Sequence, residues 1–251
     1  MGVLAREGLD EPLEQLQRVA AELGIELGAE EPDLVVVLGG DGAMLRALKQ
    51  HLGTGVPTIG VNYGRVGFLT SIPSDELEPG LRRAFSGELR VTELPTLEVE
   101  LDGQRHVGVN DVVATSSVLG RMVDIAWALG DDDLGVMGCD GIVCSTPSGS
   151  TAYNLSNGGP VLVWGLDAVA VTFVSPHSLH VRPLVAPRGR DLGITNATTR
   201  TDLTVIADGV EIGRLQPGAR AAVRLGPARS LLASLPEVTF FRRYRDAFGS
   251  P

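Results

Sequence analysis

The sequence lacks the features that mark secreted, membrane-spanning and nucleic-acid-binding proteins. No apolar stretch approaches the ~20 residues needed to cross a bilayer, and the N-terminus lacks the charged and then apolar layout of a signal peptide. Only two cysteines are present, Cys139 and Cys144, with no histidine nearby in the sequence, so neither a disulfide framework nor a metal-ligand pattern is indicated. The formal net charge of -10 provides no basic field for nucleic acid or an anionic membrane. We therefore expect a cytoplasmic protein with free thiols that binds neither.

The first part of the chain alternates strand-like and helical segments. With 251 residues and 43% hydrophobic content, the chain is long and apolar enough for packed cores. Residues 10–24 have apolar positions at helical spacing and end at Gly24, residues 34–38 and 56–61 are strand-like, and residues 74–85 are helical. We therefore predict that residues 1–89 form an α/β domain with a small parallel sheet covered by helices.

Residues 90–228 have a different pattern. Short apolar or alternating runs such as 97–101, 168–174 and 203–207 are separated by turns such as Asp102-Gly103 and Asp208-Gly209, which predicts a mainly β domain. The run 168–174 is more apolar than one small core requires, so we expect this domain to form the contacts of a homodimer or homotetramer, with a simply internal strand as the alternative. The aromatic and basic tail, residues 229–251, is expected to pack back on the body; a frayed end is the alternative.

A glycine-rich turn with one aspartate, Gly39-Gly40-Asp41-Gly42, joins a predicted buried strand to a predicted helix. Glycines let backbone N–H groups approach a phosphate, and the helix N-terminus adds partial positive charge. The carboxylate of Asp41 repels a phosphate, unless it accepts a proton from an attacking hydroxyl or helps to hold a metal. The alternative is that Asp41 is the N-cap of the following helix.

Two other segments fit either a ligand site or ordinary turns. The glycine-rich run 60–69 follows a predicted strand, so it can face the Asp41 loop across the crevice where open α/β sheets bind ligands. The pair Asn110-Asp111 ends a strand and has the groups that grip the two hydroxyls of a ribose, but Asx residues are also typical of turns.

The longest coordinated pattern lies at residues 140–156, where an apolar strand enters a turn dense in hydroxyl groups. Ser150 or Thr151 can cap a helix that begins near Ala152. Such a turn is suited to reading the edge of a base, and Tyr153 offers a flat face for stacking. A plain helix cap with a packed tyrosine is the competing interpretation.

Together these segments resemble the bacterial NAD kinase family, which phosphorylates the 2′-hydroxyl of the adenosine ribose of NAD. The resemblance rests on GGDGAMLRA at 39–47, GVNYGRVGFL at 60–69, ND at 110–111, DGIVCSTPSGSTAYNLSNGGPVL at 140–162, SPHSLHVRPLV at 175–185 and the Asp208-Gly209 turn. It covers most of the chain, whereas diacylglycerol kinases and phosphofructokinases share little beyond the glycine-aspartate loop. The chain departs from the family at residues 1–5, at best a stub of the first strand, which puts the edge of the first sheet in doubt.

The resemblance implies a role for each matching residue of the first domain. Asp41 would be the base that takes the proton from the 2′-hydroxyl, and Asp41 and Gly42 would also contact NAD. Gly39, Gly40 and Gly42 would shape the phosphate loop, with Arg46 one helical turn on as a charged partner for phosphate.

For the second domain the resemblance implies the NAD-binding residues. Asn110 and Asp111 look like the ribose and phosphate pair of the family, although many members have glutamate at the position of Asp111 and threonine at that of Ser148. Arg121 and Asp140 fall where members contact the dinucleotide, and the position of Asp140 can serve a neighbouring subunit's site. The wall on the adenine side would comprise Thr151, Ala152, Tyr153, Asn154, Leu155 and Ser156, with Tyr153 stacking.

The predicted function is therefore transfer of the terminal phosphoryl group of ATP, or of polyphosphate, to NAD, which gives NADP. Positioning and charge neutralisation suffice for phosphoryl transfer, so a base, a glycine loop, an arginine and Mg²⁺ or another divalent cation form a complete set. The metal ligands are unknown. One alternative is a lipid or nucleoside kinase with the same loop, which the 140–162 block disfavours because a lipid has no adenine. The other is a non-catalytic NAD(H) sensor, which has no need of a base.

Overall fold

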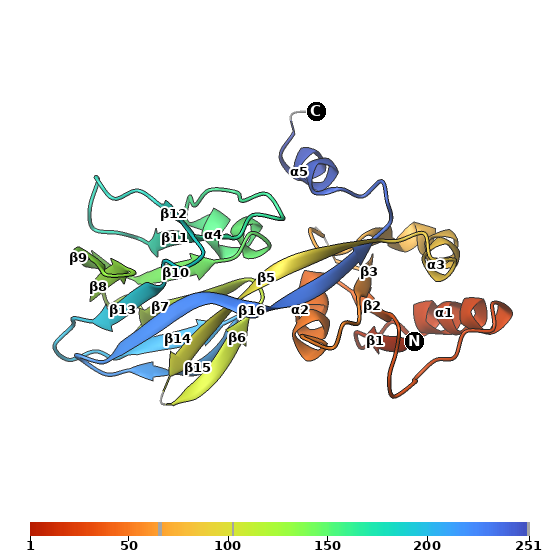
Figure 1. Cartoon of the computed structure of the whole chain (residues 1–251), viewed down its shortest axis with the longest axis horizontal. Helices are drawn as coiled ribbons and strands as arrows, with labels where there is room; N and C mark the ends of the chain where they lie inside the picture. The colour runs from red at the N-terminus through yellow and green to blue at the C-terminus, as the bar shows by residue number, and fades with distance from the viewer. Residues whose placement is uncertain (65–66, 102, 250–251) are drawn as a thin grey trace. The chain divides into compact units, whose positions relative to one another are not determined.

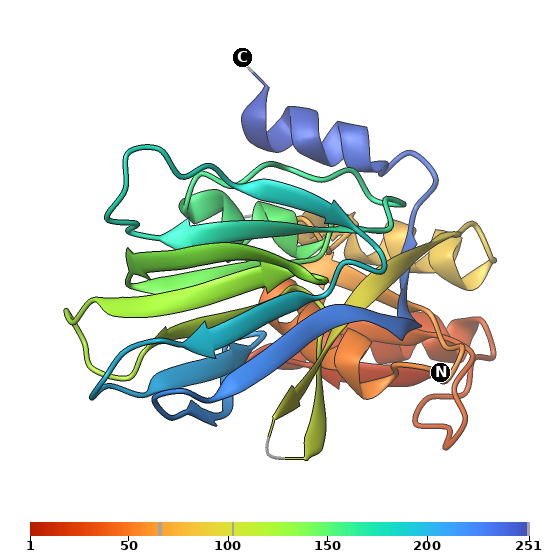
Figure 2. The ribbon, with the colours of Figure 1, turned by 60° about the vertical axis from the view of Figure 1, so that its left-hand side comes forward.

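The structure, a computed structural model, describes residues 1–64, 67–101 and 103–249, which form two compact units. Unit 1 comprises Met1–Glu93 and Arg229–Pro251, and unit 2 comprises Leu94–Ala228. Two long paired strands, β5 (Arg90–Leu101) and β16 (Arg220–Ser234), have residues in both units and run side by side (Figures 1 and 2). Three residues of the predicted motifs, Arg65, Val66 and Asp102, lie outside the described residues.

Unit 1 is built on a parallel sheet, as predicted. Strands β1 (Gly2–Ala5), β2 (Val35–Gly39) and β3 (Thr58–Asn62) lie next to one another in parallel, and the short β4 (Ile72–Pro73) continues beside the end of β3. The last part of β16 pairs in parallel with β3 at Leu232 and Thr58. All five residues of β2 are buried, which is typical of a parallel strand covered on both faces.

Helices supply the rest of the unit 1 core. They are α1 (Asp10–Glu22), α2 (Asp41–Gln50), the 3₁₀ turn η1 (Ser74–Glu76) that leads into α3 (Leu77–Phe85), and α5 (Phe240–Phe248). Leu16, Val19 and Ala20 of α1 share one buried cluster with Leu77 and Leu81 of α3. The predicted helices at 10–24 and 74–85 are confirmed, and Gly24 follows α1 with φ +66°, a conformation typical of a helix stop.

The doubt about the first strand was wrong. Residues Gly2 to Ala5 pair in parallel with Val35 to Leu38 along the whole length of β1. The Gly2 N–H donates to the Leu34 carbonyl at 2.9 Å, and the Arg6 N–H donates to the Leu38 carbonyl at 3.0 Å. Four residues are therefore enough to cover the edge of β2.

Unit 2 is a two-layer β structure. One sheet has six antiparallel strands in the order β12 (Leu184–Pro187), β11 (Ala168–Val174), β10 (Gly141–Ser145), β7 (Asp111–Ser116), β14 (Leu203–Ala207) and β15 (Val210–Leu215). In the other layer β16 is followed by β13 (Leu192–Asn196), β8 (Val123–Leu129) and β9 (Asp132–Cys139), and β6 (Gln104–Gly108) pairs with β5. Helical structure is limited to η2 (Gly149–Thr151) and α4 (Tyr153–Ser156) among the described residues of this unit. The predicted mainly β fold is confirmed.

Buried apolar side chains from both layers form one core. Trp127 of β8 meets Phe173 of β11 edge to face, with ring centroids 5.1 Å apart. The apolar run 168–174 is the interior strand β11, with β10 and β12 on its two sides and five of its seven residues buried. Its apolar character is therefore explained by this core, and the expected surplus of apolar surface at this strand was wrong.

Cys139 and Cys144 are free, as predicted, and both are buried. Burial raises the pKa of the Cys139 thiol to about 12, so this thiol stays protonated at neutral pH. Within the described ranges no helix is long and apolar enough to cross a membrane.

Candidate functional site

Asp41 is the first residue of α2, directly after the buried strand β2. The N-cap is Gly40, and no side chain caps this helix, so the interpretation of Asp41 as an N-cap was wrong. Instead, its carboxylate reaches across to the loop that precedes β4. Oδ2 accepts the Phe68 N–H at 2.8 Å and Oδ1 accepts the Leu69 N–H at 3.0 Å. The carboxylate is thus held in one orientation by a segment 27 and 28 residues away.

The glycines around Asp41 have different surroundings. A Cβ on Gly39 would lie 2.8 Å from the Cβ of Ala43, so the close approach of β2 and α2 requires glycine there. Gly42 is exposed, with open space where a side chain would be. Arg46 lies one turn further along α2 and is also exposed. The start of α2 therefore leaves backbone N–H groups and one guanidinium accessible to an anion.

In unit 2, the segment that contains Asn110 is held by the carboxylate of Asp208, in the turn between β14 and β15. Asp208 accepts the N–H groups of Val109 at 2.8 Å, Asn110 at 2.7 Å and Asp111 at 3.3 Å. Its own N–H donates to the Asp111 carbonyl at 3.1 Å. Asp208 and Gly209 have φ of +50° and +80° in the two-residue turn between β14 and β15, as a type I′ hairpin turn requires.

The hydroxyl-rich turn after β10 holds the same segment from its carbonyl side. The Thr146 hydroxyl donates to the Val109 carbonyl at 2.7 Å, and the Ser148 hydroxyl donates to it at 3.1 Å. The Asn110 carbonyl accepts the Thr146 N–H at 2.9 Å. A Cβ on Gly149 would lie 2.0 Å from the Asn110 carbonyl oxygen, so only glycine fits there. The structure thus brings together the predicted Asn110-Asp111 pair and the 145–151 turn.

The side chains of Asn110 and Asp111 remain available after the backbone is satisfied. Asn110 is 8% exposed, and its Oδ1 is buried with no hydrogen-bond partner among the described residues. Burial, and secondarily the charge of Asp208, raises the pKa of Asp111 to about 7. A carboxyl that titrates near neutral pH beside an unsatisfied buried acceptor is typical of a ligand site.

The turn that leads into α4 differs from the prediction in its capping. The N-cap is Ala152 and no side chain caps this four-residue helix, so capping by Ser150 or Thr151 was wrong. The Ser150 hydroxyl is used elsewhere, since it donates to the Pro147 carbonyl at 2.7 Å and accepts the Leu162 N–H at 2.9 Å. Tyr153 is 43% exposed, so this residue is partly accessible to a ligand.

The other residues of the predicted adenine wall surround Tyr153. Asn154 is fully buried and donates to the carbonyls of Ser150 at 2.9 Å and Pro160 at 3.0 Å, and it accepts from Thr172 at 2.6 Å. Asn154 therefore holds the turn from within. Thr151, Ala152 and Leu155 are partly exposed, and Ser156 is exposed.

Arg121 and Asp140 lie at the opposite end of the six-stranded sheet from the Asn110 segment. In the β7–β10 ladder Asp111 pairs with Ser145 at one end, and Thr115 pairs with Gly141 at the other. The Asp140 carbonyl accepts the Ser116 N–H at 3.0 Å at that second end, and Arg121 follows in the loop after β7. From Asp140 to Ser145 is five residue steps, which in extended strand correspond to about 16 Å. Within unit 2, Arg121 and Asp140 therefore do not lie close to the Asn110 segment.

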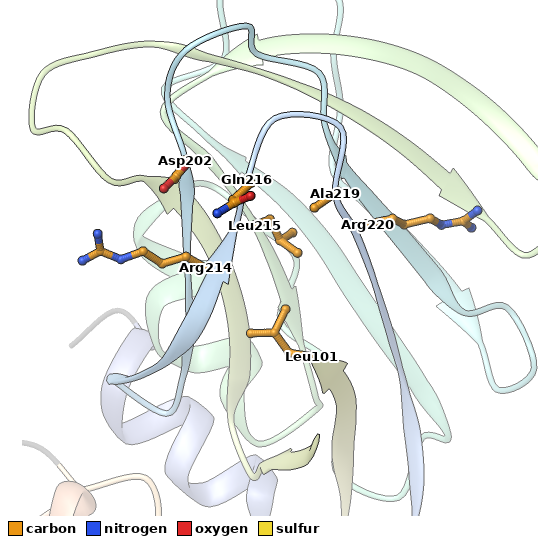
Figure 3. A pocket seen from close by; sticks show the side chains of 7 residues that line it. All are labelled: Leu101, Asp202, Arg214, Leu215, Gln216, Ala219 and Arg220. Carbon is orange, nitrogen blue, oxygen red and sulfur yellow. The ribbon is translucent and has the colours of Figure 1, made fainter. Parts of the chain in front are cut away.

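A cavity of about 440 Å³ elsewhere in unit 2 contains none of the predicted site residues. Its lining is Leu101, Asp202, Arg214, Leu215, Gln216, Ala219 and Arg220 (Figure 3). Arg214 and Arg220 extend away from each other, with the two leucines between them (Figure 3). The guanidinium groups do not converge, so this cavity does not present them to one anion.

Two residues with direct contacts to the candidate site segments were missed as site residues. Asp208 was noted only for its turn, and Arg243 only as part of a basic tail, although Arg243 donates to carbonyls of the loop that holds Asp41. Both contacts join positions about 100 residues apart or more. The sequence signals were an aspartate at a position that requires positive φ and an arginine between aromatic residues. Neither signal predicts which distant residue the side chain contacts.

No group of three or more His, Cys, Asp or Glu in the part of the chain that the structure describes is arranged to hold a metal ion. The predicted divalent cation is therefore assigned no protein ligands.

Comparisons with known proteins agree with this architecture and these motifs. Residues 18–89 match the ATP-NAD kinase N-terminal domain and residues 109–235 match the ATP-NAD kinase C-terminal domain. The chain is 38% identical to an NAD kinase of Heliobacterium modesticaldum over 219 residues, which cover 85% of this chain and 77% of that protein. It is 36% identical to an NAD kinase of Gemmatimonas aurantiaca over 238 residues, which cover 91% of this chain and 82% of that protein.

Two solved structures have the same fold. Yeast NADH kinase complexed with NADH matches with a TM-score of 0.84 at 20% identity and covers 100% of this chain and 88% of its own. An NAD kinase from Archaeoglobus fulgidus in complex with ATP matches with a TM-score of 0.80 at 24% identity and covers 99% of this chain and 96% of its own. With both domain families matched over most of its length, the chain belongs to the NAD kinase family.

Proposed function

We propose that this chain phosphorylates the 2′-hydroxyl of the adenosine ribose of NAD with ATP as donor, and that Asp41 is the general base. The observation that carries this proposal is the oriented Asp41 carboxylate at the start of α2, in a chain of the NAD kinase family. A lipid or nucleoside kinase and a non-catalytic NAD(H) sensor are not favoured.

Asp41 has the acceptor capacity that a base needs. A carboxylate has about four lone-pair sites, and the N–H groups of Phe68 and Leu69 occupy two of them. The remaining sites can accept the proton of the substrate hydroxyl. Because the two N–H groups fix the carboxylate, little reorganisation is needed when the hydroxyl attacks. The exposed Gly42 and Arg46 would bind phosphate beside it, with Gly39 and Gly40 shaping the turn.

We assign recognition of NAD to the end of unit 2 that carries the Asn110 segment. The unpartnered Oδ1 of Asn110 suits a ribose hydroxyl donor, and the Asp111 carboxyl beside it can accept a second one. The partly exposed Tyr153 would stack on adenine, with Thr151, Ala152, Leu155 and Ser156 next to it in the sequence and Asn154 stabilising the turn.

Arg121 and Asp140 support an oligomer in which each site takes residues from two subunits. They lie at the far end of β7 and β10 from Asn110, so we propose that they contact NAD bound to a neighbouring subunit of a homodimer or homotetramer. Mixing the Asp41→Asn and Asp140→Asn variants under conditions of subunit exchange should then restore part of the activity, because one of the two sites in each hybrid pair regains both carboxylates. Light scattering that shows an active monomer at assay concentration would contradict this arrangement.

The donor is expected to enter as its magnesium complex, so Mg²⁺ is treated as part of the ATP substrate. Its charge would neutralise the transferring phosphoryl group. Polyphosphate as a donor would use the same exposed N–H groups at the start of α2. The free thiols of Cys139 and Cys144 suit the reducing cytoplasm, which we propose as the location.

Product analysis after incubation with NAD, ATP and Mg²⁺ tests this function. NADP should form, and its formation should stop when a chelator removes the divalent cation. Phosphorylation of diacylglycerol with NAD left untouched would contradict the proposal.

A further inference from the structure

The C-terminal helix α5 brings a buried cation to the loop that holds Asp41. Arg243 is 5% exposed, and its Nη1 donates to the Phe68 carbonyl at 2.6 Å and also to the Thr70 carbonyl. The same loop, residues 67–70, donates two N–H groups to Asp41. The loop therefore contacts an anion on α2 through its N–H groups and a cation on α5 through its carbonyls, all within unit 1.

One peptide group joins the two charges. The peptide between Phe68 and Leu69 donates its N–H to Asp41 Oδ1 at 3.0 Å and accepts at its carbonyl oxygen from Arg243 Nη1 at 2.6 Å. A peptide between a carboxylate and a guanidinium is polarised by both, and hydrogen bonds in such a chain strengthen one another. Arg243 therefore binds the carbonyl end of the same peptide group whose N–H donates to Asp41.

The charge of Arg243 is kept despite its burial. Burial lowers the pKa of Arg243 to about 10, and the nearby charge of Asp41 works against that decrease, so the guanidinium remains cationic at neutral pH. A neutral donor would satisfy the two carbonyls at a smaller desolvation cost. The anion that offsets this cost is Asp41.

Helix α5 is fixed on the same loop by apolar contact. The ring centroids of Phe248 and Phe68 lie 5.7 Å apart, and those of Phe248 and Tyr244 lie 5.2 Å apart. At the start of the helix the Thr239 hydroxyl caps α5 by accepting the Arg242 N–H at 3.2 Å. Arg243 is thus presented from a capped helix whose far end contacts Phe68.

We propose that Arg243 is a positioning residue for phosphoryl transfer, which fixes the Asp41 carboxylate through the peptide group between Phe68 and Leu69. This inference rests on the proposed role of Asp41 as the base. It gives the C-terminal helix a part in turnover without any contact between Arg243 and substrate.

Steady-state kinetics of three variants test the inference. Arg243→Met keeps an unbranched apolar stem and removes the guanidinium with its charge, and we expect kcat to fall about 10- to 100-fold, since misplacement of a catalytic group by about 1 Å can cost about 10²-fold. KM for NAD and ATP should stay within about 2-fold of wild type, because the recognition groups are elsewhere. Arg243→Lys should restore part of kcat, and Arg245→Met, an exposed arginine of the same helix, should match wild type. Circular dichroism and thermal melting establish the folded fraction of each variant.

A double-mutant cycle with Asp41→Asn separates positioning from general loss of structure. In the Asp41→Asn background, Arg243→Met should cause no further loss of kcat, as measured with labelled ATP over long incubations. An equal fold-loss in both backgrounds, or an Arg243→Met variant with the kcat of Arg245→Met, overturns the inference and leaves the proposed function intact. If the wild-type protein forms no NADP, the proposed function is wrong. If the Asp41→Asn variant turns over at the wild-type rate, Asp41 is not the general base, and the inference about Arg243 fails with it.

Discussion

The Asp41 loop of unit 1 and the Asn110 segment of unit 2 are held in the same way but differ in charge. In each, an aspartate carboxylate accepts consecutive backbone N–H groups, two for Asp41 and three for Asp208. The unit 1 loop also has the cation Arg243 on its carbonyl side. The unit 2 segment has a second carboxyl, Asp111, whose pKa is raised by burial and by Asp208.

This difference indicates how each carboxylate is used. Two N–H groups and a nearby cation orient Asp41 and leave it acceptor sites for a substrate. Three N–H groups occupy more of the acceptor sites of the Asp208 carboxylate. They also fix the backbone from which the side chains of Asn110 and Asp111 extend. The same hydrogen-bond pattern therefore presents a reacting group in unit 1 and supports a recognition surface in unit 2.

The largest expected effect comes from Asp41→Asn, which removes proton acceptance at constant size. Turnover should fall by roughly 10²–10⁴-fold, the usual share of general base catalysis. NAD affinity should change much less, and the loss of one of the two N–H contacts should cost about 1 kcal/mol of unfolding free energy. Asp10→Asn is the matched control, since Asp10 is also the first residue of a helix. An Asp41→Asn protein that melts early but turns over at the wild-type rate makes the loop purely structural.

Asp208→Asn tests the supporting role of the unit 2 carboxylate. Asparagine tolerates the positive φ of this position, so the turn should persist while an amide N–H faces the backbone donors. We expect a loss of about 1.5–3 kcal/mol of unfolding free energy, the range for hydrogen bonds to charged groups, together with a higher KM for NAD. Glu211→Gln, an exposed change on the neighbouring strand β15, is the control. A kcat at saturating NAD as low as that of Asp41→Asn would mean that Asp208 is more than a support.

Tyr153→Ala should weaken binding and leave the chemical step largely unchanged. Tyr153 is 43% exposed, so its removal costs less packing than removal of a buried ring. If it stacks on adenine, NAD affinity should weaken by on the order of 1–3 kcal/mol, a range taken from base stacking on aromatic side chains. Isothermal titration measures this directly, and Tyr153→Phe should retain most of the affinity. Equal affinity in the alanine variant and wild type would exclude stacking on Tyr153.

Local periodicity predicted the elements well, because it depends on neighbouring residues. The predicted strands 168–174 and 203–207 have the same bounds as β11 and β14, and the helix predicted at 10–24 differs from α1 by two residues at its end. Each of these segments is defined by its own apolar pattern and the turn that follows it.

Hydrogen-bond partners were predicted poorly, because the competing groups are distant in sequence. Asp41 and Ser150 are both residue types that often cap helices, but the Asp41 carboxylate accepts from Phe68 and Leu69, 27 and 28 residues away. The Ser150 hydroxyl accepts from Leu162, 12 residues away, and donates to the nearby Pro147 carbonyl. The contact of Arg243 with Phe68 spans 175 residues. When a side chain has several possible acceptors or donors, tertiary structure determines which of them it binds, and a local sequence pattern does not contain that information.

The smallest expected effect concerns the charge of Asp111 and depends on pH. Its pKa of about 7 lies above the ordinary value, so the native protein binds this proton more tightly than the unfolded chain does, and the stability of wild type falls as pH rises from about 4 toward 7. Burial is the larger cause of this increase in the pKa of Asp111, and the charge of Asp208 adds to it. Asp111→Asn has no charge to bury, so its melting temperature relative to wild type should increase between pH 5 and pH 8, by several degrees at a scale of roughly 2–4 °C per kcal/mol. Asp124→Asn, an exposed change, should show no such trend. A melting-temperature difference that is constant across this range would mean that Asp111 is ionised throughout, and that burial and Asp208 do not raise its pKa.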